Sequence, residues 1–317
     1  YIQDALDAIE YAIGDTTTKW GAERAKNGHP APFPLKYIEI GNEDFGPVYW
    51  ERYEKIYQAL SAKYPDLIYI ANSVIRVVGR ENDDKRKDIP NFVNPKNVKV
   101  FDEHYYNSIE WACEQHYRFD NYKRGVADLF IGELGINGKY PYNLLATGAI
   151  RMSIERNGDL NPLFAERPVM RHWDFLEHRI FLPMLINGVD SSVKTSFFYL
   201  AKMFRDNTFD VCLDAAIKDI EGLQNIFVTM GYDTASKQYI LKLINLKDKK
   251  VTLQPEVSGF KRPVKADKTS LVLVPGKENT PFAPNEVQPV ETEVGLDLNQ
   301  PFELEAASMV VYRFKLK

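Results

Sequence analysis

Strand-like runs of apolar residues alternate with amphipathic helical patterns through residues 1–205. This alternation predicts an α/β region with a parallel sheet built from βα units. The patterns typical of helices lie at 2–13, 49–64, 109–122, 144–156 and 196–204, and the β-like runs lie at 37–40, 67–71, 98–101 and 129–131.

From about residue 206 the pattern changes to strands separated by turn residues. No helical pattern lies among them, and the proline-rich stretch PGKENTPFAPNEVQPVETE is typical of a loop. We therefore predict an all-β antiparallel sandwich over 206–317, after a first domain that covers 1–205. The strand-like segments are IFVTMGYD, YILKLINLK, KVTLQPEV, TSLVLVPG and SMVVYRFKL.

Composition excludes several classes of function. The 40 basic and 44 acidic residues give a formal charge of −4, which does not favour nucleic acid or an anionic membrane surface as a partner. Cys113 and Cys212 are the only cysteines and lie far apart, so no disulfide framework is indicated. Because no motif has a metal-ligand spacing either, we predict no metal and no cofactor.

Polar residues follow four of the β-like runs, in YIEI-GNE, LIYI-ANS, VKVF-DEHYY and LFI-GELG. The carboxyl ends of parallel strands converge on one face, which carries the active site in a (β/α) barrel. Glu43 and Glu133 both stand at such ends. One glutamate there is more often a cap or a surface ion pair, but two favour glycoside hydrolysis, which uses a pair of carboxyl groups.

The segment from YIQDALDAIEYAIGD to YIEIGNED, followed by FDEHYY and FIGELG, resembles glycoside hydrolase family 51, the α-L-arabinofuranosidases, over residues 2–156. The resemblance implies a partial (β/α)8 TIM-type barrel followed by the β-sandwich. It also implies a retaining, exo-acting hydrolase of terminal arabinofuranosyl residues in arabinoxylan, arabinan and other hemicellulose or pectin side chains.

By position in these motifs, the resemblance assigns roles to five residues. Glu43 would be the acid/base and Glu133 the nucleophile, whereas Asn42 would bind the sugar 2-hydroxyl. His104 and Tyr106 correspond to the His-x-Tyr pair that the family keeps beside the carboxylates. A phenol such as Tyr106 would favour an ionised nucleophile, and a semi-buried site beside a second carboxylate would favour a protonated acid.

Neighbouring aromatic and histidine residues are weaker candidates. Tyr105 alternates with His104 and Tyr106 along a strand, so it should point away from the site. Trp111, His116 and Trp173 could line a sugar subsite, but packing in the core is the commoner role for each.

The chain also departs from the family. Leu134 stands where the family commonly has an aromatic residue, and the eighth barrel strand lacks a clear counterpart, for which Arg179–Ile186 is the candidate. The first helix resembles the family segment after the third barrel strand. We therefore expect a C-terminal portion of such an enzyme, whose exposed strand edges would favour self-association into a homo-oligomer.

Two other functions stay open. The chain could be another retaining glycosidase of the same clan, with a different sugar, or a catalytically dead carbohydrate-binding fragment. The resemblance favours an extracellular or periplasmic location, although cytoplasmic members of the family exist. An arabinose-containing oligosaccharide or polysaccharide is the expected partner, without nucleic acid or membrane.

Overall fold

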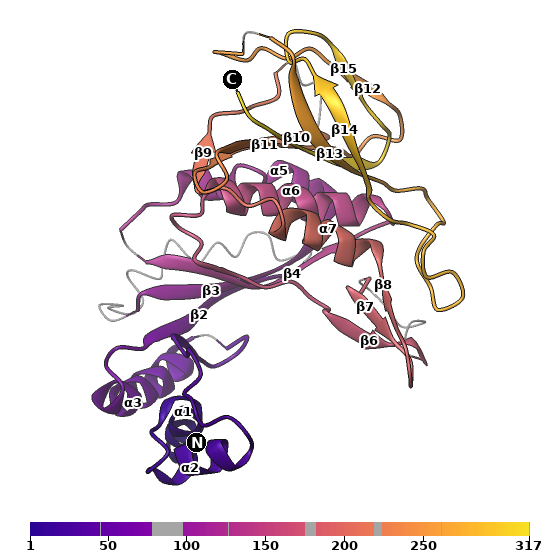
Figure 1. The fold of residues 1–317 in the computed structure, drawn as a ribbon. Helices are drawn as coiled ribbons and strands as arrows, with labels where there is room; N and C mark the ends of the chain where they lie inside the picture. The colour runs from indigo at the N-terminus through magenta and orange to yellow at the C-terminus, as the bar shows by residue number, and fades with distance from the viewer. Residues whose placement is uncertain are drawn as a thin grey trace. The chain divides into compact units, whose positions relative to one another are not determined.

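The computed structural model describes residues 1–44, 46–77, 98–125, 127–174, 182–218, 224–260 and 262–316. The chain, drawn in Figure 1, divides into two compact units, and each is described by itself below. Unit 1 comprises Tyr1–His104, Lys123–Gly132 and Pro162–Phe164, and unit 2 comprises Tyr105–Tyr122, Glu133–Asn161 and Ala165–Lys317.

Unit 1 contains helices α1 (Ile2–Ile13), α2 (Lys19–Lys26) and α3 (Pro47–Lys63). The hydroxyl of Thr18 caps α2 by accepting the Gly21 N–H at 3.2 Å, and Pro47 begins α3, where its missing N–H costs no hydrogen bond. The helices predicted at 2–13 and 49–64 are confirmed.

The sheet of unit 1 has the order β1-β2-β3-β4-β5, in which β1 pairs parallel with β2 and β4 with β5. A core of aliphatic and aromatic side chains, including Ile9, Tyr53 and Leu60, packs beside it. The expected parallel sheet with helices is therefore present. The strands are β1 (Tyr37–Ile40), β2 (Ile68–Val77), β3 (Val100–Ser108), β4 (Asp128–Asn137) and β5 (Leu163–Phe164).

Three of these strands continue past their predicted ends. They extend to Val77, Ser108 and Asn137, so the polar residues that follow the apolar runs lie within the strands. The prediction that these residues follow the strands is therefore wrong for β2, β3 and β4. The reason is that polar side chains do not interrupt a ladder of backbone hydrogen bonds, since successive residues simply face opposite sides of the sheet.

The first helices of unit 2 are α5 (Ile109–Glu114) and the 3₁₀ helix η2 (Arg118–Asn121), where one helix was predicted over 109–122. The break follows from a side-chain contact. Arg156 Nη2 donates to the carbonyl oxygen of His116 at 2.6 Å, and the Asp120 N–H instead bonds Tyr117. A continuous helix would have used that His116 carbonyl for the Asp120 N–H.

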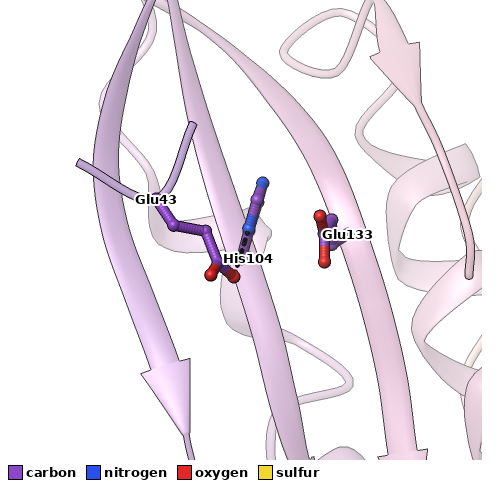
Figure 2. Close-up of side chains that lie close together, drawn as sticks. All are labelled: Glu43, His104 and Glu133. Atoms are coloured by element: carbon purple, nitrogen blue, oxygen red, sulfur yellow. Dashed lines mark hydrogen bonds and ion pairs between the residues drawn. The ribbon is translucent and has the colours of Figure 1, made fainter. Parts of the chain in front are cut away.

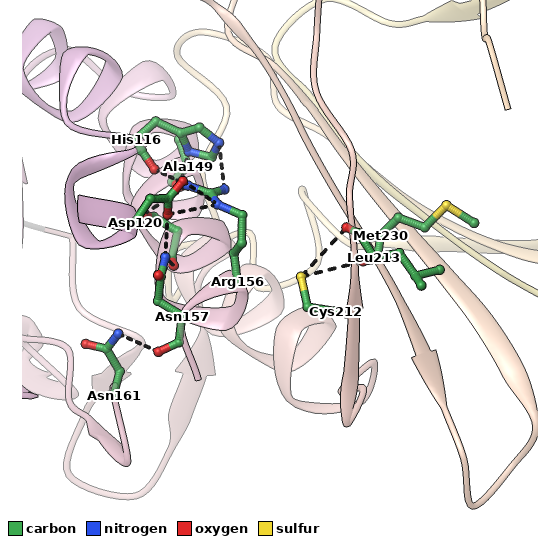
Figure 3. Close-up of polar contacts among 10 residues, drawn as sticks. His116, Asp120, Ala149, Arg156, Asn157, Asn161, Cys212, Leu213 and Met230 are labelled. Carbon is green, nitrogen blue, oxygen red and sulfur yellow. Dashed lines mark hydrogen bonds and ion pairs between the residues drawn. The ribbon is translucent and has the colours of Figure 1, made fainter. Parts of the chain in front are cut away.

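The same contacts join this segment to α6 (Tyr142–Arg156), as Figure 3 shows. His116 Nδ1 lies 2.9 Å from the carbonyl oxygen of Ala149, and the Asp120 carboxylate accepts from Arg156 Nε at 3.1 Å and from Asn157 Nδ2 at 2.6 Å. Burial, followed by the nearby charge of Arg156, lowers the pKa of His116 to about 4. This histidine is therefore neutral and structural.

The last part of unit 2 is built from antiparallel strands. Its six-stranded sheet has the order β14-β13-β16-β11-β10-β9, and a separate pair joins β12 to β15. Strand β14 begins inside the predicted proline-rich loop, so that loop is shorter than expected. The strands are β9 (Val211–Leu213), β10 (Ile226–Asp233), β11 (Gln238–Asn245), β12 (Val251–Leu253), β13 (Val264–Val272), β14 (Val290–Leu296), β15 (Phe302–Leu304) and β16 (Ser308–Phe314).

The six-stranded sheet buries side chains on both faces. Alternate residues such as Val228 and Leu243 form a core with Leu304 of β15, as in a sandwich. Residues of the opposite parity face helices: Phe227 lies 4.8 Å from the His116 ring, and Lys242 contacts Glu155 of α6. Helix α7 (Ser196–Arg205) precedes these strands, and the domain boundary near residue 206 stays a prediction.

A three-stranded sheet of β6 (Met170–His172), β7 (Leu185–Asn187) and β8 (Ser192–Lys194) completes unit 2. The candidate for an eighth barrel strand, Arg179–Ile186, lies partly outside the described residues, and its last residues begin β7. Both cysteines are free. Within the described ranges, none of the helices has the length and apolar composition needed to cross a bilayer.

Candidate active site

The turn after β1 requires glycine at position 41. Gly41 has φ +99°, and a Cβ atom there would lie 2.8 Å from Oδ1 of Asn72. Tyr49 fixes the strand ends around it, because its hydroxyl donates to the carbonyl oxygen of Ile40 and accepts the Asn72 N–H, both at 2.8 Å. Gly41, the first residue of the GNE motif, thus permits the backbone turn that positions the two polar residues after it.

Glu43 occupies a left-handed backbone conformation with φ 51°, which is uncommon for a residue with a side chain. Its side chain is 39% exposed and points to His104, with 3.1 Å between Oε1 and the ring Nδ1 (Figure 2). Asn42 is exposed in the same bend. The structure therefore brings Glu43 and His104 together, as the sequence predicts.

Strand β3 presents its polar residues with a period of two. Asp102, His104 and Tyr106 alternate with Glu103 and Tyr105. Tyr105 is fully buried, and its ring lies 5.3 Å from that of Trp111. The expectation that Tyr105 points away from the site agrees with this packing.

Asp102 anchors the other side of the His104 ring. Its carboxylate is 2% exposed, and Oδ2 lies 2.7 Å from His104 Nε2. Its Oδ1 accepts the backbone N–H of Gly132, the residue before Glu133, at 2.8 Å. A Cβ atom at position 132 would lie 2.4 Å from Oδ1, so only glycine lets β4 approach this carboxylate.

These contacts set the direction of the hydrogen bonds around His104. An ionised Asp102 accepts but cannot donate, so the imidazole proton lies on Nε2, and Nδ1 of a neutral ring is left as an acceptor. With a neutral ring, Nδ1 can accept from a protonated Glu43, whereas a ring with protons on both nitrogens donates to both carboxylates. His104 can therefore exchange a proton with Glu43 in either direction.

Glu133 has surroundings of the opposite kind, within unit 2. The hydroxyl of Tyr106 donates to Glu133 Oε2, and Arg167 Nη1 donates to the same hydroxyl at 2.6 Å. Arg167 Nε also lies 3.7 Å from Glu133 Oε2. A hydrogen-bond donor and a positive charge both favour the ionised carboxylate.

A further carboxyl group, Glu39 of β1, lies beside Asp102 and was not predicted. Its Oε1 accepts from Asn72 Nδ2 at 2.6 Å. Partial desolvation, followed by the neighbouring Asp102, raises the pKa of Glu39 to about 8. Glu39 is exposed, so water weakens the effect of its own desolvation on the pKa. The charge of the buried Asp102 is screened less.

Sequence reasoning thus missed Glu39, Asp102 and Arg167. The signal for Asp102 was its alternation with His104 and Tyr106 along one strand, whereas Glu39 lies in a strand that ends before Glu43. Nothing in the local pattern indicates Arg167, which lies far from Tyr106 in the chain.

The weaker candidates lie in different surroundings. Trp111 and His116 are buried in unit 2, 8% and 1% exposed, as core packing requires, whereas Trp173 is 39% exposed beside Phe282. Leu134 is buried. Both ring nitrogens of His104 contact carboxylates of unit 1, so these three residues form a continuous chain of polar contacts. The expected absence of a metal stays a prediction.

Comparison with known proteins identifies the family. Residues 1–124 match the model of the α-L-arabinofuranosidase 1 domain. Over 211 residues, 66% of this chain and 25% of the relative, the chain is 35% identical to an extracellular exo-α-L-arabinofuranosidase of Streptomyces chartreusis. It is 26% identical to α-L-arabinofuranosidase 2 of Arabidopsis thaliana over 92% of this chain and 42% of that protein.

The chain belongs to the family 51 α-L-arabinofuranosidases. Its fold also matches the arabinose-bound α-L-arabinofuranosidase MgGH51, with a TM-score of 0.80 and 22% identity over 99% of this chain and 51% of that one. The glycoside hydrolase family expected from the sequence is thereby confirmed. The chain spans less than half the length of the two curated relatives, so the activity of the whole protein belongs to the proposal below.

Proposed function

We propose that this chain carries the two catalytic carboxyl groups of a retaining exo-α-L-arabinofuranosidase. The observation that supports the proposal best is the contrast between its two glutamates. Glu43 faces a ring nitrogen that can accept its proton, whereas Glu133 faces the Tyr106 hydroxyl and the Arg167 guanidinium. One environment suits an acid and the other a nucleophile, which is the division of roles that retention of configuration requires.

The proposed reaction proceeds in two displacements. Glu133 attacks the anomeric carbon as the glycosidic C–O bond breaks, and Glu43 transfers its proton to the departing oxygen. The resulting ester links the arabinosyl unit to Glu133. Glu43, now ionised, removes a proton from water, whose oxygen attacks the same carbon and releases Glu133. Two inversions leave the configuration unchanged.

The other site residues would position these groups. Asn42, exposed in the bend before Glu43, would bind the 2-hydroxyl in a contact that strengthens in the transition state. His104 would orient Glu43, and Tyr106 with Arg167 would orient Glu133. We also predict that the two catalytic carboxyl groups lie about 5 Å apart, the separation of a retaining mechanism.

Hydrolysis of a nitrophenyl α-L-arabinofuranoside tests the proposal, with the 317-residue chain and with the complete product of its gene. We expect turnover by the complete protein and little by the chain alone, because a site held by part of a barrel positions the sugar poorly. Glu133→Gln should abolish turnover. Glu54→Gln, a change on the exposed face of α3, is the matched control.

The other two functions have distinct outcomes in the same experiment. Turnover of a different glycoside, with arabinofuranosides untouched, would indicate another glycosidase of the clan. Binding of arabino-oligosaccharides without any turnover by the complete protein would indicate a carbohydrate-binding fragment. Either result would overturn the proposal.

A further inference from the structure

Two neighbouring residues of unit 2, Glu166 and Arg167, face opposite surroundings. The Arg167 side chain is 44% exposed and reaches the Tyr106 hydroxyl, whereas the Glu166 side chain is 1% exposed. Both lie in the segment 165–169, between β5 and β6, where the chain forms neither helix nor strand. A regular ladder of backbone hydrogen bonds therefore does not fix Arg167, and its position depends on the side chains of this segment.

An ion pair joins the buried Glu166 to helix α6. Arg151 Nε lies 3.1 Å from Glu166 Oε1, and the guanidinium carbon of Arg151 lies 4.9 Å from the centre of the Phe204 ring in α7. Burial raises the pKa of Glu166, and the positive charge of Arg151 opposes that shift. A buried carboxylate is costly unless a cation compensates it, so Glu166 is stable in this position only where it meets Arg151.

This ion pair contributes more to geometry than to stability. Two apolar residues of similar size would stabilise a buried position about as well, but a contact between two charges holds the chain in one placement. Arg167 follows Glu166 directly, and neighbouring Cα atoms are only ~3.8 Å apart. A fixed Glu166 therefore fixes the point from which the Arg167 side chain starts.

The Arg167 side chain needs such a support. A pocket lies beside it, lined in addition by Leu134, Leu144 and Phe197, so packing does not enclose the side chain on every side. A long and partly exposed side chain also loses rotamer freedom when it is held in one place. If its backbone shifted, the guanidinium could therefore turn away from Tyr106.

We propose that Glu166 is a positioning residue that holds Arg167 in place beside Glu133. Its ion pair with Arg151 supplies the anchor. The inference rests on the proposed role of Glu133 as the nucleophile. Without the anchor, the Tyr106 hydroxyl would lose a donor and Glu133 would lose a neighbouring positive charge, so the ionised nucleophile would be less favoured.

Tyrosine NMR of the 317-residue chain tests the proposal without catalysis. The tyrosines are labelled at the ring carbon that bears the hydroxyl, and Tyr106→Phe assigns the signal of Tyr106. Arg167→Met should shift this signal, because the hydroxyl loses a donor. Glu166→Leu should shift it in the same direction, since the guanidinium of Arg167 is then no longer held.

A second variant keeps the test decisive if Glu166→Leu, which leaves Arg151 without its carboxylate, does not fold. The double variant Arg151→Met, Glu166→Leu removes both charges and should fold, because replacement of a buried ion pair by apolar residues is often neutral. Urea unfolding checks that each variant is folded. The Tyr106 signal of the double variant should shift as in Arg167→Met, and an unchanged signal in a folded variant without Glu166 would overturn the proposal.

Kinetics of the complete protein separate positioning from a purely structural role. Arg167→Met and the double variant should each lower kcat about tenfold with KM little changed. Each should also move the acid limb of the pH profile of kcat/KM to higher pH, because the nucleophile loses a positive charge. Glu54→Gln, on the exposed face of α3, is the control.

The triple variant combines the double variant with Arg167→Met. It should lose no more activity than Arg167→Met alone, because the anchor acts only through Arg167. Losses that multiply, or an acid limb that stays in place in the double variant, would overturn the proposal. Absence of arabinofuranosidase activity in every protein would count against the proposed function alone, since the tyrosine NMR would still decide whether Glu166 holds Arg167.

Discussion

The Nε2 atom of His104 lies 2.7 Å from Oδ2 of Asp102, whose carboxylate is almost completely buried. The two residues are separated by one position on β3, so the pleat of the strand places their side chains on the same face. The backbone of β3 alone therefore brings these two side chains together. The Asp102 carboxylate holds the ring in one direction, and through the ring it reaches Glu43.

Asp102→Asn should lower activity of the complete protein by roughly tenfold to a hundredfold while the fold is kept. The asparagine amide can donate to Nε2, which moves the ring proton to Nδ1 and removes the acceptor that faces Glu43. The loss should be larger on arabino-oligosaccharides than on nitrophenyl arabinofuranosides, because a nitrophenolate leaves without a proton. Comparison of kcat/KM on both substrates measures it, with Asp66→Asn in an exposed turn as the control.

Tyr106→Phe should reduce kcat about tenfold with little change in KM. The variant removes the hydroxyl that donates to Glu133 and accepts from Arg167, but it keeps the aromatic ring that lies 5.0 Å from the guanidinium. Attack on the anomeric carbon should therefore slow while the sugar still binds. Steady-state kinetics of the complete protein check this, and a kcat equal to that of the control Tyr37→Phe would contradict the proposed role.

Lys242→Met should destabilise the chain by about 3 kcal/mol. The Lys242 side chain is fully buried and Glu155 is 20% exposed, so removal of the ammonium leaves a largely desolvated carboxyl without its cation. Burial raises the pKa of Glu155 and lowers that of Lys242, and the charge of each partner opposes the shift of the other.

The double variant Lys242→Met, Glu155→Leu should recover stability to within about 1 kcal/mol of the parent, because neither charge is then buried alone. Urea unfolding of the four proteins of this double-mutant cycle gives the coupling. Lys265→Met, which breaks an exposed pair with Glu293, should change stability by less than about 1 kcal/mol. Equal losses in the buried and exposed variants would refute the prediction.

The free energy of unfolding should fall as the pH drops from 6.5 toward 4, partly because of His116. The pKa of His116 is lowered from 6.5 to about 4 in the folded chain. As the pH falls, the unfolded chain therefore takes up this proton first, which favours the unfolded state over the folded state. The contribution is about 3 kcal/mol, present above pH 6.5 and lost by pH 4.

His116→Gln should flatten this dependence, whereas His172→Gln, at a half-buried histidine, should leave it nearly unchanged. Urea unfolding at several pH values measures the three slopes. A variant at His116 with the same slope as the parent would show that another group dominates the acid response.

The sequence by itself determined the elements whose periodicity is local. Residues 2–13, 37–40 and 226–233 have the predicted structure, because a helix or strand with one buried face repeats its apolar residues at a fixed interval. The sequence also supplied Glu43, Glu133 and the His-x-Tyr pair, since each lies in a short contiguous motif.

Only the tertiary structure decided where strands β2, β3 and β4 end and which polar groups meet. A strand continues as long as a neighbour supplies hydrogen bonds, and that neighbour comes from a distant part of the chain. For the same reason the sequence did not show that Arg167 reaches Tyr106. Hydrogen bonds and charges act over a few ångströms of space, whereas periodicity reports only on neighbours along the chain.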